Sequence, residues 1–78
     1  MTANIRTIKT SKFIKYLKSK GLKAIREKGD HLMLTRKDLP RPVVIQTKFK
    51  EQSILVIKNT LKLIDESVED FLKEIDNI

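Results

Sequence analysis

Apolar positions first repeat with the period of a helix in residues 10–20. The apolar face of this segment holds Phe13, Ile14 and Leu17, with Tyr16 at its margin. Lysines occupy the opposite face. Thr10 and Ser11 are candidates for capping the first turn, and Gly21 predicts the end of the helix, because many helices end on a glycine in the left-handed conformation.

Three segments that follow have the length and composition of short strands. They are residues 22–27 (LKAIRE), 31–36 (HLMLTR) and 43–47 (VVIQT). Gly29 and Asp30 predict a tight turn between the first two strands, which should therefore pair antiparallel. The link RKDLPRP before the third strand contains two prolines, and we predict a loop there because proline is not tolerated in a central strand.

The last third of the chain predicts two helices. The first covers roughly residues 53–64, where apolar residues recur at helical spacing. Its main stripe is Ile54, Ile57, Leu61 and Ile64, and the residues that widen this stripe toward a second buried contact are Leu55, Val56 and Leu63. Ser67 opens the second helix, with Glu69 and Asp70 in a first turn that resembles a capping box. Its stripe is Val68, Phe71, Leu72 and Ile75.

The predicted order of elements is therefore α-β-β-β-α-α within a single domain over residues 1–78. A three-stranded antiparallel sheet needs a cover on at least one face, and the helices must bury their apolar stripes. The simplest solution is an α+β two-layer sandwich, with the helices on one face of the sheet and the other face open to solvent. Residues 1–9 carry little pattern, and we expect a loose, mobile lead-in there.

The composition narrows the possible functions. The chain has no cysteine, which excludes disulfides and thiolate metal sites and fits a reducing compartment. A single histidine argues further against a structural zinc site, and we expect no cofactor. The start MTANIRTIKT lacks the apolar core of a signal peptide, and no apolar run approaches the roughly 20 residues that span a bilayer. We therefore expect a cytoplasmic protein with no membrane segment.

Charge is distributed unevenly along the chain. Residues 1–50 hold 14 Lys and Arg against 3 acids, a balance of +11, whereas residues 51–78 hold 3 Lys against 7 acids, a balance of −4, which together give the net charge of +7. A basic body of this kind attracts polyanions such as RNA and makes their binding salt-dependent. The alternative is a lysine-rich surface that only keeps the protein in solution.

His31 is the only histidine and the main candidate for chemistry, because histidine titrates near physiological pH and is the commonest general acid or base. Leu32 and Leu34 form the better core pair, so His31 should point to the open face of the sheet. The cations expected near it are Lys28, Arg26 and Lys48. Such a histidine can take the proton of an RNA 2′-OH while the cations stabilise charge at phosphorus, without a metal. The plain alternative is a turn histidine bonded to backbone.

The segment TSKFIKYLKSKGLKAIREKGDHLML resembles the beginning of HicA-type (YcfA-like) toxins, which are small ribonucleases of toxin–antitoxin pairs. In that family a lysine-rich helix ending in Gly precedes an alternating strand, an arginine, a Lys-Gly-Ser-His turn and an apolar strand. The matching positions here are Leu17, Gly21, Ile25, Arg26, Lys28, Gly29 and His31. PVVIQT is similar to the family's third strand, and residues 67–72 (SVEDFL) are similar to its closing segment.

The resemblance implies a fold like that of double-stranded-RNA-binding domains (dsRBD-like), α-β-β-β-α with an additional C-terminal helix. It also implies cleavage of mRNA with His31 as the catalytic residue, Gly29 setting its turn, and neutralisation by a HicB-like antitoxin. Two departures bear on activity rather than on fold. Asp30 replaces the family's serine, and the link TKFKEQSI before the second helix lacks the family's Gly or Pro.

Two other functions are compatible with the same residues. A non-catalytic RNA-binding module of dsRBD-like fold would recognise duplex shape and phosphate across the minor groove, with His31 as a contact residue. A protein-interaction domain would instead present its basic face to an acidic partner. Competition by RNA separates this third function from the first two, and cleavage that depends on His31 separates the enzyme from the binding module.

Overall fold

The computed structural model describes residues 6–78. Its elements are β1 (Ile8–Lys9), α1 (Thr10–Ser19), β2 (Lys23–Lys28), β3 (His31–Thr35), β4 (Val43–Gln46), β5 (Glu51–Gln52), α2 (Ile54–Leu63) and α3 (Val68–Ile75). The predicted three helices and three main strands are all present, close to their predicted bounds, and the α+β class is confirmed. No helix within residues 6–78 is long and apolar enough to cross a bilayer.

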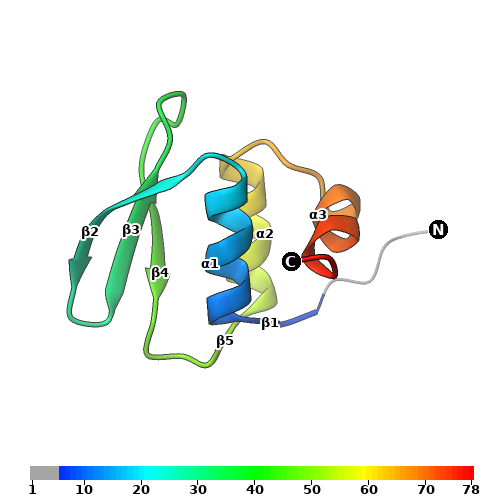
Figure 1. Cartoon of the computed structure of the whole chain (residues 1–78), viewed down its shortest axis with the longest axis horizontal. Coiled ribbons are helices and arrows are strands. Elements are labelled where there is room, and N and C mark those ends of the chain that lie inside the picture. Colours follow the sequence, from blue (N-terminus) through cyan, green and yellow to red (C-terminus); the bar gives the residue numbers. More distant parts are fainter. Residues whose placement is uncertain (1–5) are drawn as a thin grey trace.

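The main sheet is antiparallel, with β3 between β2 and β4 (Figure 1). The two-residue turn at Gly29 and Asp30 joins β2 to β3, and Gly29 has φ of +57°, a conformation that glycine adopts without steric cost. The register places His31 between Lys28 of β2 and Gln46 of β4. This register decides which side chains of the three strands share a face with His31.

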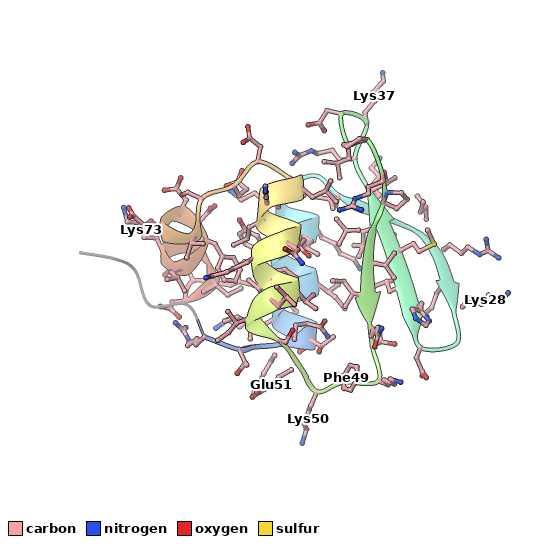
Figure 2. All side chains as sticks on the ribbon, turned by 180° about the vertical axis from the view of Figure 1, so that it is seen from behind. Lys28, Lys37, Phe49, Lys50, Glu51 and Lys73 are labelled. Carbon is pink, nitrogen blue, oxygen red and sulfur yellow. The ribbon has the colours of Figure 1, made fainter. Side chains whose placement is uncertain are left out.

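The sheet, the helix pair α1 and α2, and then α3 follow one another along the longest dimension of the protein (Figures 1 and 2). The main sheet contributes Leu34, Val43 and Ile45 to the core. The helices and the C-cap of α2 contribute Phe13, Tyr16, Leu17, Ile57, Leu61, Ile64, Phe71 and Ile75. Phe71 of α3 contacts Phe13 and Tyr16 of α1 edge-on, with ring centroids 5.8 and 4.8 Å apart. The predicted two layers are therefore present, and α3 packs against the helix layer rather than against the sheet.

A second, two-stranded sheet joins the start of the described chain to the segment before α2. Ile8 pairs with Gln52 and Lys9 pairs with Glu51, and Ile8 is only 4 % exposed. The loose lead-in expected over residues 1–9 is therefore wrong for Ile8 and Lys9, and residues 1–5 lie outside the described part of the chain. A strand of two residues is too short to show any periodicity in the sequence.

Two further expectations about the helices are wrong in detail. Lys9, not Thr10 or Ser11, occupies the N-cap of α1 and makes no side-chain cap bond, because an ammonium group has no acceptor to offer. The Thr10 hydroxyl instead donates to the Phe49 carbonyl. In α2, Ile54 is 39 % and Leu55 is 68 % exposed. The first turn of α2 therefore borders solvent: Ile54 leaves the main buried stripe, and the second buried contact expected for the wider stripe does not include Leu55.

Candidate functional site

His31 is the first residue of β3 and is exposed on the open face of the sheet. Leu34 is fully buried and Leu32 packs against the core from the opposite face, so the alternation predicted from the sequence is confirmed. The buried Leu34 and the partly buried Leu32 fix the face to which His31 points, because a slip of one residue would turn both leucines toward water.

One hollow on this face lies beside the β2–β3 turn and is called the cationic hollow here. Its lining residues are Arg26, Lys28, Gly29, Asp30, His31, Met33 and Val44, and its volume is about 530 Å³. The register puts Lys28 directly opposite His31, and Arg26 opposite Met33. Paired residues of neighbouring strands share a face, so the structure brings Arg26 and Lys28 to His31, as the sequence predicted.

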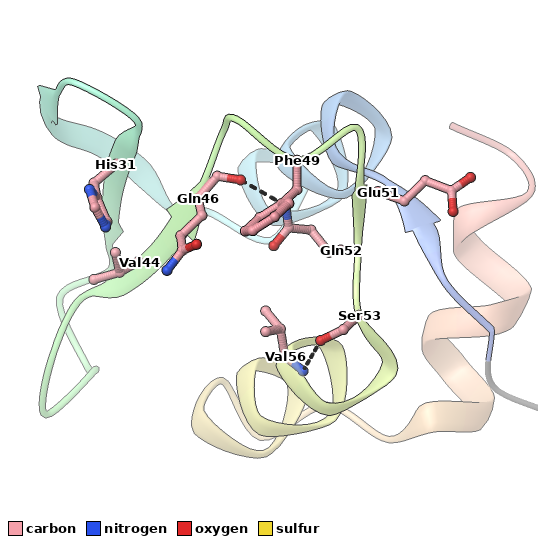
Figure 3. Close-up of a pocket in the computed structure, with 8 residues that line it drawn as sticks. All are labelled: His31, Val44, Gln46, Phe49, Glu51, Gln52, Ser53 and Val56. Carbon is pink, nitrogen blue, oxygen red and sulfur yellow. Dashed lines mark hydrogen bonds between the residues drawn. The ribbon is translucent and has the colours of Figure 1, made fainter.

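A second hollow, called the aromatic hollow here, lies on the other side of His31 (Figure 3). It is lined by His31, Val44, Gln46, Phe49, Glu51, Gln52, Ser53 and Val56, and its volume is about 500 Å³. The carboxylate of Glu51 points away from the other lining side chains in Figure 3 and accepts a hydrogen bond from the Thr7 hydroxyl at 3.0 Å. His31 and Val44 line both hollows, so the imidazole stands on the boundary between them.

Lys48, the third cation expected near His31, is not among the residues that line either hollow. It lies two residues after the end of β4, and its ammonium group is 5.2 Å from the centre of the Phe49 ring. The role of Lys48 beside His31 therefore stays a prediction. What the structure shows is its ammonium group over the ring that lines the aromatic hollow.

The loop that carries Phe49 is held by two residues that sequence reasoning did not select for the site. The amide nitrogen of Gln52, a buried residue, donates to the Thr10 hydroxyl at 2.8 Å and to the Gln46 carbonyl at 3.0 Å. The Thr10 hydroxyl donates to the Phe49 carbonyl, and the Thr10 backbone N–H donates to the Lys50 carbonyl at 2.9 Å. These bonds close the loop between β4 and β5 and fix the wall of the aromatic hollow.

Charge is segregated in space as well as along the sequence. Lys28 of the β2–β3 hairpin and Lys73 of α3 lie at opposite ends of the protein (Figure 2). Two cations near α3 are paired with acids: the Lys20 Nζ lies 2.7 Å from a Glu74 carboxylate oxygen, and an Arg6 guanidinium nitrogen lies 2.7 Å from an Asp76 carboxylate oxygen. The hydrogen bond that Lys20 donates to the Glu74 carboxylate raises the pKa of Lys20. Within residues 6–78, neither Arg26 nor Lys28 forms an ion pair, so both side chains are free to contact an anion, although Asp30 lines the same hollow.

No group of three His, Cys, Asp or Glu side chains gathers closely enough to hold a metal ion in the part of the chain that the structure describes. Comparison with known proteins finds no matching family model, no curated protein and no solved structure that is significantly similar to this chain. The likeness to HicA-type toxins therefore stays a prediction carried by the residues quoted above. The chemistry available at the site is that of one exposed imidazole, an arginine, a lysine and a carboxylate around a hollow open to solvent.

Proposed function

We propose that the protein is a toxin of the HicA type, a metal-independent endoribonuclease of mRNA in which His31 transfers the proton. The observation that carries this proposal is the position of His31, exposed between the cationic and the aromatic hollow. Arg26 and Lys28 lie on the same face beside it and supply the positive charge that a phosphate needs. The resemblance over residues 10–75 supports the choice of an RNA substrate and a dsRBD-like fold.

In the proposed reaction the neutral imidazole of His31 accepts the proton of a ribose 2′-OH. The 2′-oxygen then forms a bond to the adjacent phosphorus, and the bond from phosphorus to the 5′-oxygen of the next nucleotide breaks. That leaving oxygen takes a proton from water. Arg26 and Lys28 donate hydrogen bonds to the phosphate oxygens, where negative charge grows in the transition state. The products are a 2′,3′-cyclic phosphate and a free 5′-OH.

A non-catalytic RNA-binding module is the second candidate, and the position of Asp30 favours it. The carboxylate residue Asp30 lines the same hollow as His31 and Lys28, and an ionised carboxylate repels a phosphate that approaches the imidazole. RNA could then be held by its backbone on the cationic face without reaching His31 in a reactive geometry.

The deciding experiment incubates a long single-stranded RNA with the wild type, His31→Ala, Lys28→Ala and Lys73→Ala in buffer that contains a chelator. Cleavage and binding are followed in the same samples. We expect His31→Ala to abolish cleavage and retain binding, and Lys28→Ala to weaken both. Lys73→Ala removes the same charge at the far end and should change neither.

Four outcomes contradict the proposed enzyme or its mechanism. Equal cleavage by wild type and His31→Ala removes the role of His31, and binding without cleavage by the wild type leaves the RNA-binding module. Absence of RNA binding overturns both candidates and leaves a protein-interaction domain. Where cleavage occurs, products that lack a 2′,3′-cyclic phosphate contradict the proposed reaction.

The proposed antitoxin partner is tested in cells. Expression of the wild type should arrest growth, expression of His31→Ala should not, and co-expression of a HicB-like protein encoded beside the gene should restore growth. Arrest by both variants alike would show toxicity unrelated to His31.

A further inference from the structure

Phe49 is an aromatic residue that the core does not use. It is 50 % exposed, and its ring forms part of the wall of the aromatic hollow (Figure 3). Its backbone carbonyl is nevertheless held by Thr10, whose hydroxyl is in turn held by the buried Gln52. The fold therefore fixes the backbone that carries this large apolar ring and leaves half of the residue's surface in water.

The surroundings of Phe49 suit a planar group attached to an anion. Lys48 lies over its ring and Lys50 follows it in the chain, while Gln46 extends its amide into the same hollow (Figure 3). A volume of about 500 Å³ lies within the range of small-ligand pockets, roughly 300 to 1,000 Å³. Aromatic rings flanked by cations are the platforms on which proteins stack the bases of single-stranded nucleic acids.

We propose that the aromatic hollow binds one unpaired nucleobase of RNA, stacked on Phe49, and thereby directs the protein to single-stranded RNA. This inference rests on the proposed function and names its substrate class. The Gln46 amide carries both donors and an acceptor and faces the edge of the bound base. A base within a duplex is stacked and paired, so it cannot enter the hollow.

One polarity of the bound strand would bring its 2′-OH to His31. In a nucleotide the 2′-OH lies between the base and the 3′-phosphate. With the base in the aromatic hollow and its 3′-phosphate in the cationic hollow, the 2′-OH lies over His31, which lines both. Cleavage therefore falls directly on the 3′ side of the stacked nucleotide.

The test measures binding of a 12-nucleotide RNA, single-stranded or annealed to its complement, in a His31→Ala background that prevents cleavage. The variants are Phe49→Ala, Phe49→Trp and Leu55→Ala, the last being a control because Leu55 is 68 % exposed on α2 and lines neither hollow. Phe49→Ala should weaken single-strand binding roughly 10-fold or more, the usual effect of removing a stacking platform. Duplex binding should change less than about twofold, and Phe49→Trp should retain single-strand affinity.

A 2-aminopurine base placed in the single strand reports stacking directly. Its fluorescence should fall when the RNA binds the parent protein, which carries His31→Ala alone, and should not fall when Phe49→Ala is added. Equal single-strand affinity of Phe49→Ala and the parent, or equal loss on both RNA forms, overturns the inference. If Lys28→Ala weakens RNA binding while Phe49→Ala does not, the base site fails and the proposed function stands. If the parent binds neither RNA, both fail. Circular dichroism confirms that each variant is folded.

Discussion

The backbone carbonyl of Asp30 accepts two hydrogen bonds from Thr47, one from the backbone N–H at 2.7 Å and one from the hydroxyl at 3.1 Å. Asp30 precedes His31 in the β2–β3 turn, and Thr47 follows the end of β4. The pair therefore joins the turn that presents His31 to the loop that presents Phe49. The walls of the two hollows on either side of His31 are therefore linked by hydrogen bonds.

Replacing Thr47 with valine removes the hydroxyl bond and keeps the backbone bond. Because the bond is exposed, we expect the free energy of unfolding to fall by less than about 1 kcal/mol. Cleavage should fall more clearly, roughly 3- to 10-fold, because small displacements of a catalytic group are costly. Thr47→Ser keeps the hydroxyl and should retain most of the activity. Equal rates for Thr47→Val and the wild type would show that the bond does not position His31.

Removing the charge of Asp30 should strengthen RNA binding. Asp30 lines the cationic hollow, and loss of one repulsive charge near a phosphate at the surface is worth about 1 kcal/mol, or roughly fivefold in affinity. Glu27→Gln is the matched control, since Glu27 pairs with Leu32 and faces the other side of the sheet. Asp30→Asn and Glu27→Gln should differ at low salt and converge at high salt. The same gain in both variants would assign the effect to net charge alone.

The position of His31 could be predicted from the sequence because local patterns determine it. Leu32 and Leu34 alternate with it, and Gly29 takes the positive φ that the turn requires. The same holds for the Ser67 cap, whose hydroxyl accepts from the Asp70 N–H at 3.1 Å. Each of these depends on residues within a few positions of one another.

The rest of the site depends on contacts between distant parts of the chain, which leave no local pattern. Thr10 and Gln52 are 42 positions apart, and one glutamine beside a helix carries no signal that it will be buried. The same closed loop places the Lys48 ammonium group over the Phe49 ring, a contact that no local pattern indicates. The dsRBD-like likeness and the roles of the site residues stay predictions.

Arg36 forms hydrogen bonds with the C-terminal ends of two helices, and nothing in the sequence indicated this role. Its guanidinium donates to the carbonyls of Lys20 and Ile64, at 2.8 and 3.2 Å, and these are the C-cap residues of α1 and α2. Its remaining bonds go to Asp38, at 2.6 and 3.2 Å. Removing the guanidinium with Arg36→Met should lower the free energy of unfolding by roughly 2 to 3 kcal/mol, as is typical for charge-assisted bonds.

Urea unfolding checks this prediction, with Arg41→Met as the control because Arg41 is exposed on the same loop. Arg36→Lys should recover only part of the loss, since one ammonium group lacks the planar fork that reaches both carbonyls. A loss in Arg36→Met no larger than in Arg41→Met would mean that solvent replaces these bonds without cost.

Ionisation of the buried Tyr16 hydroxyl should lower the free energy of unfolding at alkaline pH. Its side chain is fully buried, and its hydroxyl has no hydrogen-bond partner among the described residues. Burial, followed by the charges of Glu66, Glu74 and Asp70, raises the pKa of Tyr16 above its ordinary value. When folding raises the pKa of a group, that group contributes its full stabilisation at pH values below its unfolded pKa, which is about 10 for tyrosine. The contribution is lost as the pH rises above that value.

Tyr16→Phe should therefore unfold with equal or higher free energy than the wild type at neutral pH, by up to about 1 kcal/mol, because a buried hydroxyl without a partner is removed. From about pH 9 to about pH 11 its stability should fall less steeply than that of the wild type. A decline remains because the pKa of Lys20 is also raised, first by its hydrogen bond with Glu74, and that contribution is lost over the same range. Lys20→Met in the Tyr16→Phe background should flatten the profile further. A Tyr16→Phe variant that declines as steeply as the wild type would show that the Tyr16 hydroxyl ionises in contact with solvent.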